Sequence, residues 1–109
     1  MITTTLRWIA NETGAPMRTV RWLVDACKIK AEKDLADGLV RIEADEIERM
    51  RRYYAAAKLS DVVRDMAPRD QDRIRRAIKR GEIESLRLHS ASEYRLDQPA
   101  IDRVAELVR

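Results

Sequence analysis

Apolar residues recur at helical spacing in the first part of the chain, and a short turn interrupts them. The first stripe covers residues 6–10, and Thr5 can cap a helix there. The turn at residues 13–16 contains Gly and Pro and ends this helix. A second helix is predicted over residues 17–27, where apolar residues follow the i, i+3, i+4, i+7 pattern of a buried face. The pattern therefore predicts two helices joined by a tight turn.

Two shorter segments with strand character come next. Residues 29–33 and 39–42 are separated by a polar loop, and Gly38 lies near its tip, which favours a β-hairpin. A third amphipathic helix is predicted to begin at Asp45 and to reach residue 57. The first part of the chain thus has the order helix, turn, helix, hairpin, helix.

The second part of the chain repeats this order. Four pairs of matching residues are separated by 54 positions: Arg41/Arg95, Ile42/Leu96, Ile47/Ile101 and Met50/Val104. The offset is 53 before the second helix, so the match needs one inserted residue, and this pattern indicates an internal duplication. The repeat predicts a helix over 59–66, a turn at 67–69, a helix from an Asp70 N-cap to residue 80, a hairpin over 83–96 and a helix over 98–108. We expect two units, residues 1–56 and 57–109.

The length favours two small units that pack together. The chain has 109 residues, and units of about 50 residues bury a small share of their surface. Residues 54–58 contain no flexible linker, so we expect a fixed relative orientation of the units. The single Cys27 excludes an internal disulfide, fits a reducing compartment and is predicted to fill the core. Without a signal peptide or a long apolar run, a soluble cytoplasmic protein is expected, with no membrane partner.

Composition and motifs exclude several classes of function. The net charge of +3 is too small to indicate a polyanion partner unless the basic residues gather on one face. The chain has no Gly-rich phosphate loop, no Ser/His/Asp set and no cluster of His and Cys, and His89 is the single histidine. We therefore expect no enzymatic activity, no metal site and no cofactor.

The order of elements is that of a winged helix-turn-helix, in which the second helix enters the major groove and the hairpin reaches the flanking backbone. The segments LRWIANETGAPMRTVRWLVDACKIKAEK and GLVRIEADEIERM resemble MerR-type and excisionase-type winged-helix domains. The likeness lies in a Leu-xx-hydrophobic-Ala start, a Gly turn, an Arg-Thr-hydrophobic-Arg helix and a Gly-xx-Arg-aliphatic wing strand. It covers residues 5–52, and it extends to residues 58–107 mostly through the repeat. The expected fold is mainly α with small β-hairpin wings, as a tandem winged helix-turn-helix.

This resemblance implies binding of double-stranded DNA, with two adjacent half-sites for the two units. In the first unit it assigns DNA contact to Arg18, Thr19, Arg21 and Trp22 on the second helix and to Lys30, Lys33 and Arg41 on the wing. In the second unit the matching residues are Arg73, Arg75, Arg76, Lys79 and Arg80 on the helix and Arg87 and Arg95 on the wing. Such a protein would be a small transcriptional regulator or an excisionase-like recombination directionality factor of a mobile element, associated with the nucleoid when bound.

Several features keep a different function open. Trp22 stands where such helices usually carry a polar or basic residue, and it could stack on DNA or pack against a wing or a neighbouring domain. Asp70 and Asp72 would repel phosphates, although residues 73–80 include five basic residues and no acid, which favours a phosphate-facing helix over a merely solvated one. The alternative is a protein-interaction module, an antirepressor, antiactivator or phage assembly adaptor that keeps the fold without binding DNA. The last apolar stripe, over 101–108, fits either a core or a homodimer seam.

Overall fold

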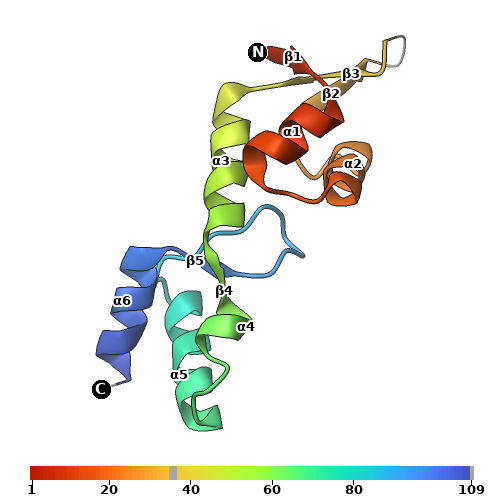
Figure 1. Ribbon diagram of the computed structural model, residues 1–109. Coiled ribbons are helices and arrows are strands. Elements are labelled where there is room, and N and C mark those ends of the chain that lie inside the picture. Colours follow the sequence, from red (N-terminus) through yellow and green to blue (C-terminus); the bar gives the residue numbers. More distant parts are fainter. Residues whose placement is uncertain (35–36, 109) are drawn as a thin grey trace. The chain divides into compact units, whose positions relative to one another are not determined.

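The computed structural model describes residues 1–34 and 37–108, which divide into two compact units (Figure 1). Unit 1 comprises Met1–Ala55 together with Leu88–Ser90, and unit 2 comprises Ala56–Arg87 and Ala91–Arg109. The described part of the chain is mainly helical with small antiparallel sheets, as the coarse prediction states. None of the helices in that part is long and apolar enough to cross a membrane.

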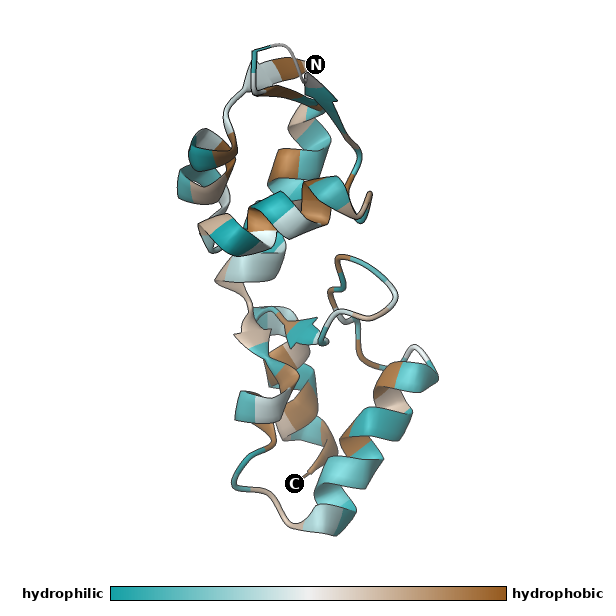
Figure 2. Ribbon diagram, turned by 90° about the vertical axis from the view of Figure 1, so that its right-hand side faces the viewer, coloured by the Kyte–Doolittle hydropathy of each residue, from teal (hydrophilic) through white to brown (hydrophobic). Residues whose placement is uncertain are grey.

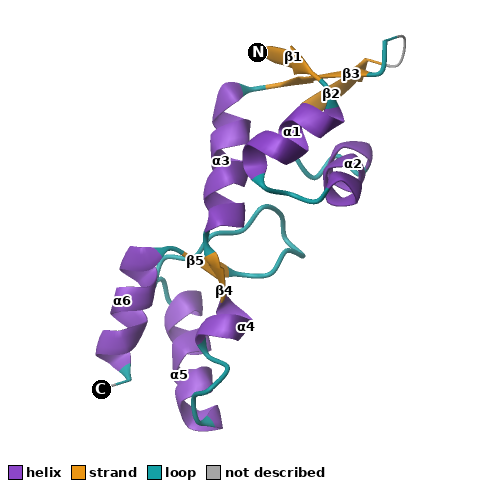
Figure 3. Ribbon diagram, in the orientation of Figure 1, coloured by secondary structure: helices purple, strands orange, loops and turns teal. Residues whose placement is uncertain are grey.

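Unit 1 is a three-helix unit covered by a three-stranded sheet. Its elements are, in chain order, β1 (Ile2–Thr4), α1 (Leu6–Thr13), α2 (Met17–Asp25), β2 (Ala31–Asp34), β3 (Leu39–Ile42) and α3 (Ala44–Ala55). The strands are antiparallel in the order β1-β3-β2, and α1 packs against both α2 and α3 (Figure 3). The core side chains are fully buried and come from every helix and from β3: Ile9, Val20, Leu23, Ile42 and Met50. Packing on this core leaves the other side of α2 in solvent.

Unit 2 has shorter strands and its own core. Its elements are β4 (Ala57–Lys58), α4 (Leu59–Val62), α5 (Pro68–Lys79), β5 (Arg95–Leu96) and α6 (Gln98–Leu107). The core cluster gathers Leu59, Val63, Ile74, Ala77, Ile78, Ile83, Leu96, Ala100 and Val104. Val104 of the C-terminal stripe is therefore a core residue. In Figure 2 hydrophobic and hydrophilic residues alternate along the helices, the distribution of amphipathic helices with one buried face.

The local backbone geometry of unit 1 recurs in unit 2 at the offset of 54 residues. The Lys28 amide donates to the carbonyl of Leu23 over 2.9 Å, and the Glu82 amide donates to that of Ala77 over the same distance. The residues before these amides, Cys27 and Gly81, have φ angles of 55° and 79°. The pairing of Glu32 with Arg41 in unit 1 likewise matches the bridge between Leu86 and Arg95 in unit 2. The match first seen in apolar positions thus extends to backbone hydrogen bonds.

In unit 1 the predicted elements are present, with shifts at their ends. Thr5 is the N-cap of α1, because its hydroxyl accepts a hydrogen bond of 3.1 Å from the Trp8 amide, so that prediction is confirmed. The second helix ends at Asp25 and not at residue 27, since Cys27 takes the left-handed conformation that terminates helices. Cys27 is exposed, so its predicted place in the core is wrong. The tip of the predicted loop, residues 35–36, lies outside the described residues.

In unit 2 three sequence predictions are wrong in detail. The second helix begins at Pro68 with Ala67 as its N-cap, and Asp70 lies inside its first turn, because proline is preorganised for the first helical position. The preceding helix is only the four residues of α4. The predicted hairpin over 83–96 is reduced to the bridge between Leu86 and Arg95, since β5 pairs instead with β4. That pairing also ends α3 at Ala55, so residue 57 is in a strand and not in a helix.

The left-handed residues after α2 and α5 give a matched test of backbone strain. We expect Cys27→Gly to stabilise the protein by about 0.5–1 kcal/mol, because a side chain in this conformation is strained and glycine is not. Gly81→Ala is expected to destabilise it by about 1 kcal/mol, and a Cβ there would meet no atom within 4 Å, so the backbone alone sets the cost. Denaturant unfolding measures the free energy of unfolding of both variants. A change of the same sign in both would contradict the assignment of left-handed backbone strain to these two positions.

Candidate nucleic-acid interface

Helix α2 presents two arginines on its solvent side. Val20, Leu23 and Val24 are buried, so the side chains on the opposite face, Arg18 and Arg21 among them, are exposed. Within the described residues neither arginine takes part in an ion pair. The acid at the end of the helix, Asp25, is engaged elsewhere, because its Oδ1 lies 3.1 Å from the Nζ of Lys33. Thr19 is half-buried at the edge of this face. The arginines of α2 are thus available to an anionic ligand, whereas Lys33 already has a partner.

Trp22 lies on the same face of α2 and is 48% exposed. Its ring meets the ring of His89 edge to face, with 5.4 Å between centroids and an interplanar angle of 63°. His89 belongs to the segment Leu88–Ser90 of unit 1, and the Nη1 of Arg49 donates to the Leu88 carbonyl over 2.9 Å. Trp22 therefore packs against His89 of the same unit, and about half of the residue is still open to a ligand.

The predicted wing residues of unit 1 lie on different faces of its sheet. Arg41 pairs with Glu32 across the ladder, and both are exposed on the face opposite the buried Val40 and Ile42. Lys33 pairs with Val40, so it points to the side of the helices, where it meets Asp25. Lys30 is exposed just before β2. The sheet therefore places Arg41 and Lys33 on opposite faces and does not gather the predicted wing cations on one surface. Arg41 has the carboxylate of Glu32 as its neighbour.

Helix α5 carries the densest group of cations without partners. Ile74, Ala77 and Ile78 face the core, and the basic residues predicted for this helix are all exposed: Arg73, Arg75, Arg76 and Lys79, followed by Arg80 at the C-cap. No salt bridge involves any of them among the described residues. On α3 and α6, by contrast, Arg51 pairs with Glu12 at 3.0 Å and Arg103 pairs with Glu106 at 2.8 Å. The exposed cations of α2 and α5 therefore differ in pairing from these arginines of α3 and α6.

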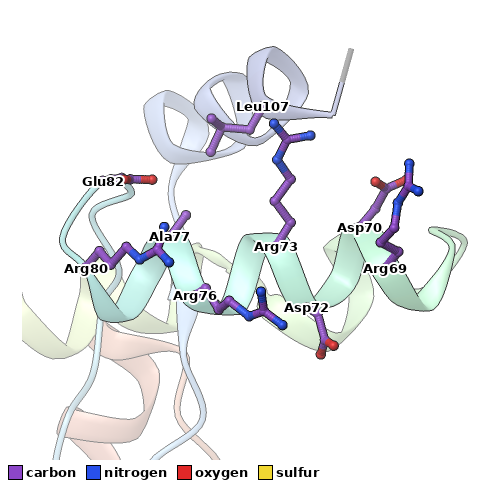
Figure 4. Close-up of a pocket in the computed structure, with 9 residues that line it drawn as sticks. All are labelled: Arg69, Asp70, Asp72, Arg73, Arg76, Ala77, Arg80, Glu82 and Leu107. Carbon is purple, nitrogen blue, oxygen red and sulfur yellow. The ribbon is translucent and has the colours of Figure 1, made fainter.

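The cations of α5 form two rows on either side of the helix. One row, with spacings of four, three and four residues, borders a depression of about 520 Å³ that we call the α6-side groove (Figure 4). Its lining comprises Arg69, Asp70, Asp72, Arg73, Arg76, Ala77, Arg80, Glu82 and Leu107. The other row borders a depression of about 200 Å³, the wing-side groove, lined by Leu59, Arg75, Ile78, Lys79 and Tyr94. The basic residues within 73–80, which form one cluster in the sequence, therefore border two separate surfaces.

The two predicted wing arginines of unit 2 make contacts inside the unit. The guanidinium of Arg87 lies 4.6 Å from the ring centroid of Tyr94, and its Nη1 donates to the Tyr94 hydroxyl over 3.3 Å. This contact places a cation beside the wing-side groove. Arg95 is half-buried in the β4–β5 ladder, and its Nη1 donates to the Ala56 carbonyl over 3.3 Å. Arg95 thus supports the sheet of unit 2, and Arg87 flanks a candidate ligand surface.

The sequence prediction omitted Arg69, Tyr94 and Leu107. Arg69 was placed in a turn, although Pro68 before it marks a first helical position and would have extended the row of arginines by one turn. Nothing in the local sequence brings Tyr94 to α5, because that proximity depends on the return of the chain after residue 83. Comparisons with protein-family models, with curated proteins and with solved structures gave no match.

Proposed function

We propose that this protein binds double-stranded DNA through two winged helix-turn-helix units, in which α2 and α5 are the helices that enter the major groove. The observation that carries the proposal is the contrast in pairing. The cations on the exposed sides of α2 and α5 have no ion pairs within the described chain, whereas Arg49, Arg51 and Arg103 on α3 and α6 and Arg64 in the turn after α4 are paired. Cations of this kind are suited to neutralise phosphates.

The absence of pairing on α5 is informative because acids are within reach. Asp70 precedes Arg73 by three residues, and Asp72 precedes Arg76 by four, the spacings at which helical ion pairs form. No pair forms at either spacing. The six exposed cations of α5 and its C-cap therefore repel one another until an anionic ligand meets them. A DNA backbone that meets Arg75 and Lys79 relieves part of that repulsion and releases its condensed counterions.

The two units would contribute differently. The face of α2 offers Arg18, Arg21 and the open half of Trp22, which suits contact with base edges, sugars and the adjacent phosphates. The wing-side groove of unit 2 offers Arg75 and Lys79 next to Tyr94, which suits contact with the phosphate backbone. Two such units on one chain suit a site with two adjacent half-sites. Both a transcriptional regulator and an excisionase-like recombination directionality factor bind in this way.

One observation favours a second function, a protein-interaction module without DNA binding. Met17 and Trp22, both on α2, are 39% and 48% exposed, and exposed large apolar residues are typical of protein interfaces. In this case the face of α2 would bind an antirepressor target or a phage assembly partner instead of a major groove. A protein-interaction function of α2 does not explain the exposed cations of α5.

A mobility shift with a random duplex separates the two functions. The protein is titrated to micromolar concentration at about 50 mM salt, where nonspecific binding is strong. The DNA function predicts a shifted complex that disappears as salt is raised. If the duplex migrates unchanged at every protein concentration, the DNA function is wrong and the protein-interaction function is favoured.

A further inference from the structure

We propose that the α6-side groove of unit 2 binds an acidic helical segment of a partner protein. This surface is separate from the wing-side groove: the two linings share no residue. In Figure 4 Arg73 points from α5 toward Leu107 of α6, so α6 borders one side of the groove. The proposal concerns a second ligand and goes beyond the proposed DNA function.

The row of arginines along the groove indicates an anionic ligand of elongated form. Arg69, Arg73, Arg76 and Arg80 follow one another at spacings of four, three and four residues, which aligns them on one side of α5. Eleven residues of helix correspond to about 16 Å. All four side chains are exposed, and none has a salt bridge among the residues described. A ligand helix that carries acids at the same spacing could meet the whole row.

The acids in the groove argue against a nucleic acid as the ligand. Asp70 and Asp72 lie at the N-terminal end of the row, and Glu82 lies beyond its C-terminal end. A duplex carries one negative charge per about 1.7 Å of its axis, so phosphates would have to approach these carboxylates. A protein segment avoids this repulsion, because it can place Glu opposite the arginines and Lys opposite the acids at each end.

The apolar part of the lining also fits a protein segment. Ala77 and Leu107 border the groove, and Leu107 is only partly buried against the core of unit 2. Phosphates gain nothing from such a surface, whereas an amphipathic helix places apolar side chains in an apolar groove next to its acids. The chemistry of the groove therefore specifies a helix with Glu at i, i+4 and i+7, a neighbouring Leu and basic residues at both ends.

A fluorescently labelled peptide with this pattern tests the proposal against the full chain. Its control is a peptide of the same composition in which the glutamates are distributed around the helix. We expect the patterned peptide to raise the anisotropy at micromolar protein and the control peptide to bind at least tenfold more weakly. We expect R69Q/R73Q to weaken the patterned peptide at least tenfold. The matched variant R75Q/K79Q removes the same charge from the same helix and should change its affinity less than twofold.

Two outcomes overturn the proposal: equal binding of both peptides, including no binding of either, and equal loss in both double variants. A labelled duplex measured with the same variants identifies the alternative ligand. If R69Q/R73Q abolishes duplex binding and leaves the patterned peptide unaffected, the groove is a phosphate site. Circular dichroism confirms folding, and R76Q provides a second variant of the row. Because the peptide assay contains no DNA, its result does not depend on whether the proposed DNA function holds.

Discussion

Replacing Arg75 and Lys79 together by Gln is expected to weaken binding of a random duplex about 100-fold at about 50 mM salt. Each side chain has no ion pair among the described residues and borders the wing-side groove, so each can donate to a phosphate. A hydrogen bond to a charged group contributes about 1.5 kcal/mol or more, which is roughly tenfold in affinity for each residue. Gln has nearly the helix propensity of Arg and Lys, so α5 should remain folded. Fluorescence anisotropy with a labelled duplex measures the loss.

The control for this variant is R64Q/R103Q, which removes the same charge from unit 2. Arg64 pairs with Asp61 and Arg103 pairs with Glu106, so neither is available to DNA without breaking an ion pair. We expect the control to weaken binding less than about threefold. A similar loss in both double variants would mean that overall charge and not the wing-side groove governs binding. An unchanged affinity of R75Q/K79Q would mean that unit 2 does not contact DNA.

Ile74→Ala is expected to destabilise unit 2 by about 2–5 kcal/mol. Ile74 is fully buried at the centre of the core cluster, and removal of three heavy atoms leaves a cavity. A unit of about 50 residues has a total stability of about 3–8 kcal/mol, so the loss takes most of it. Hydrogen exchange should show lost protection in α5 and α6.

A partly buried residue of the same type gives the comparison. Ile101 of α6 packs at the edge of the same core, so Ile101→Ala should cost less than Ile74→Ala. Unit 1 has a separate core around Leu23 and Met50, so the amides of α1 and α3 should lose less protection than those of α5. Unchanged protection of α5 in Ile74→Ala would contradict this description of the core.

Hydrophobic periodicity predicted the helices and β3 because those elements bury one face each. The faces of α2 and α5 followed from the same periodicity, and this is why Arg21 and Arg75 were placed on exposed sides correctly. Helix ends were less predictable, because they depend on single conformations. The left-handed Cys27 shortened α2, and Pro68 moved the start of α5. The short strand β1 has no period of its own and is formed by pairing with β3.

Contacts between residues far apart in the chain decide which candidate site residues are engaged and which are available to a ligand. Local sequence patterns do not reveal these contacts. Lys33 pairs with Asp25 because the strand β2 returns alongside the end of α2. His89 meets Trp22, a residue far earlier in the chain. Arg95 is half-buried in a two-stranded ladder that a hairpin prediction does not contain. Burial and pairing of this kind depend on tertiary packing. The sequence alone could therefore propose these residues, but it could not show which cations are exposed without a partner and which are already buried or paired.

The dependence of duplex affinity on salt concentration is the sharpest test of DNA binding through α2 and α5. Four cations without ion pairs in the described chain lie on the proposed DNA-facing surfaces of α2 and of the wing-side groove: Arg18, Arg21, Arg75 and Lys79. At about 0.9 per contact they predict a slope of about −3.6 for the logarithm of affinity against the logarithm of salt, or a loss of roughly 150-fold between 50 and 200 mM salt. A slope near zero, or no binding at about 50 mM salt, would contradict DNA binding through these helices.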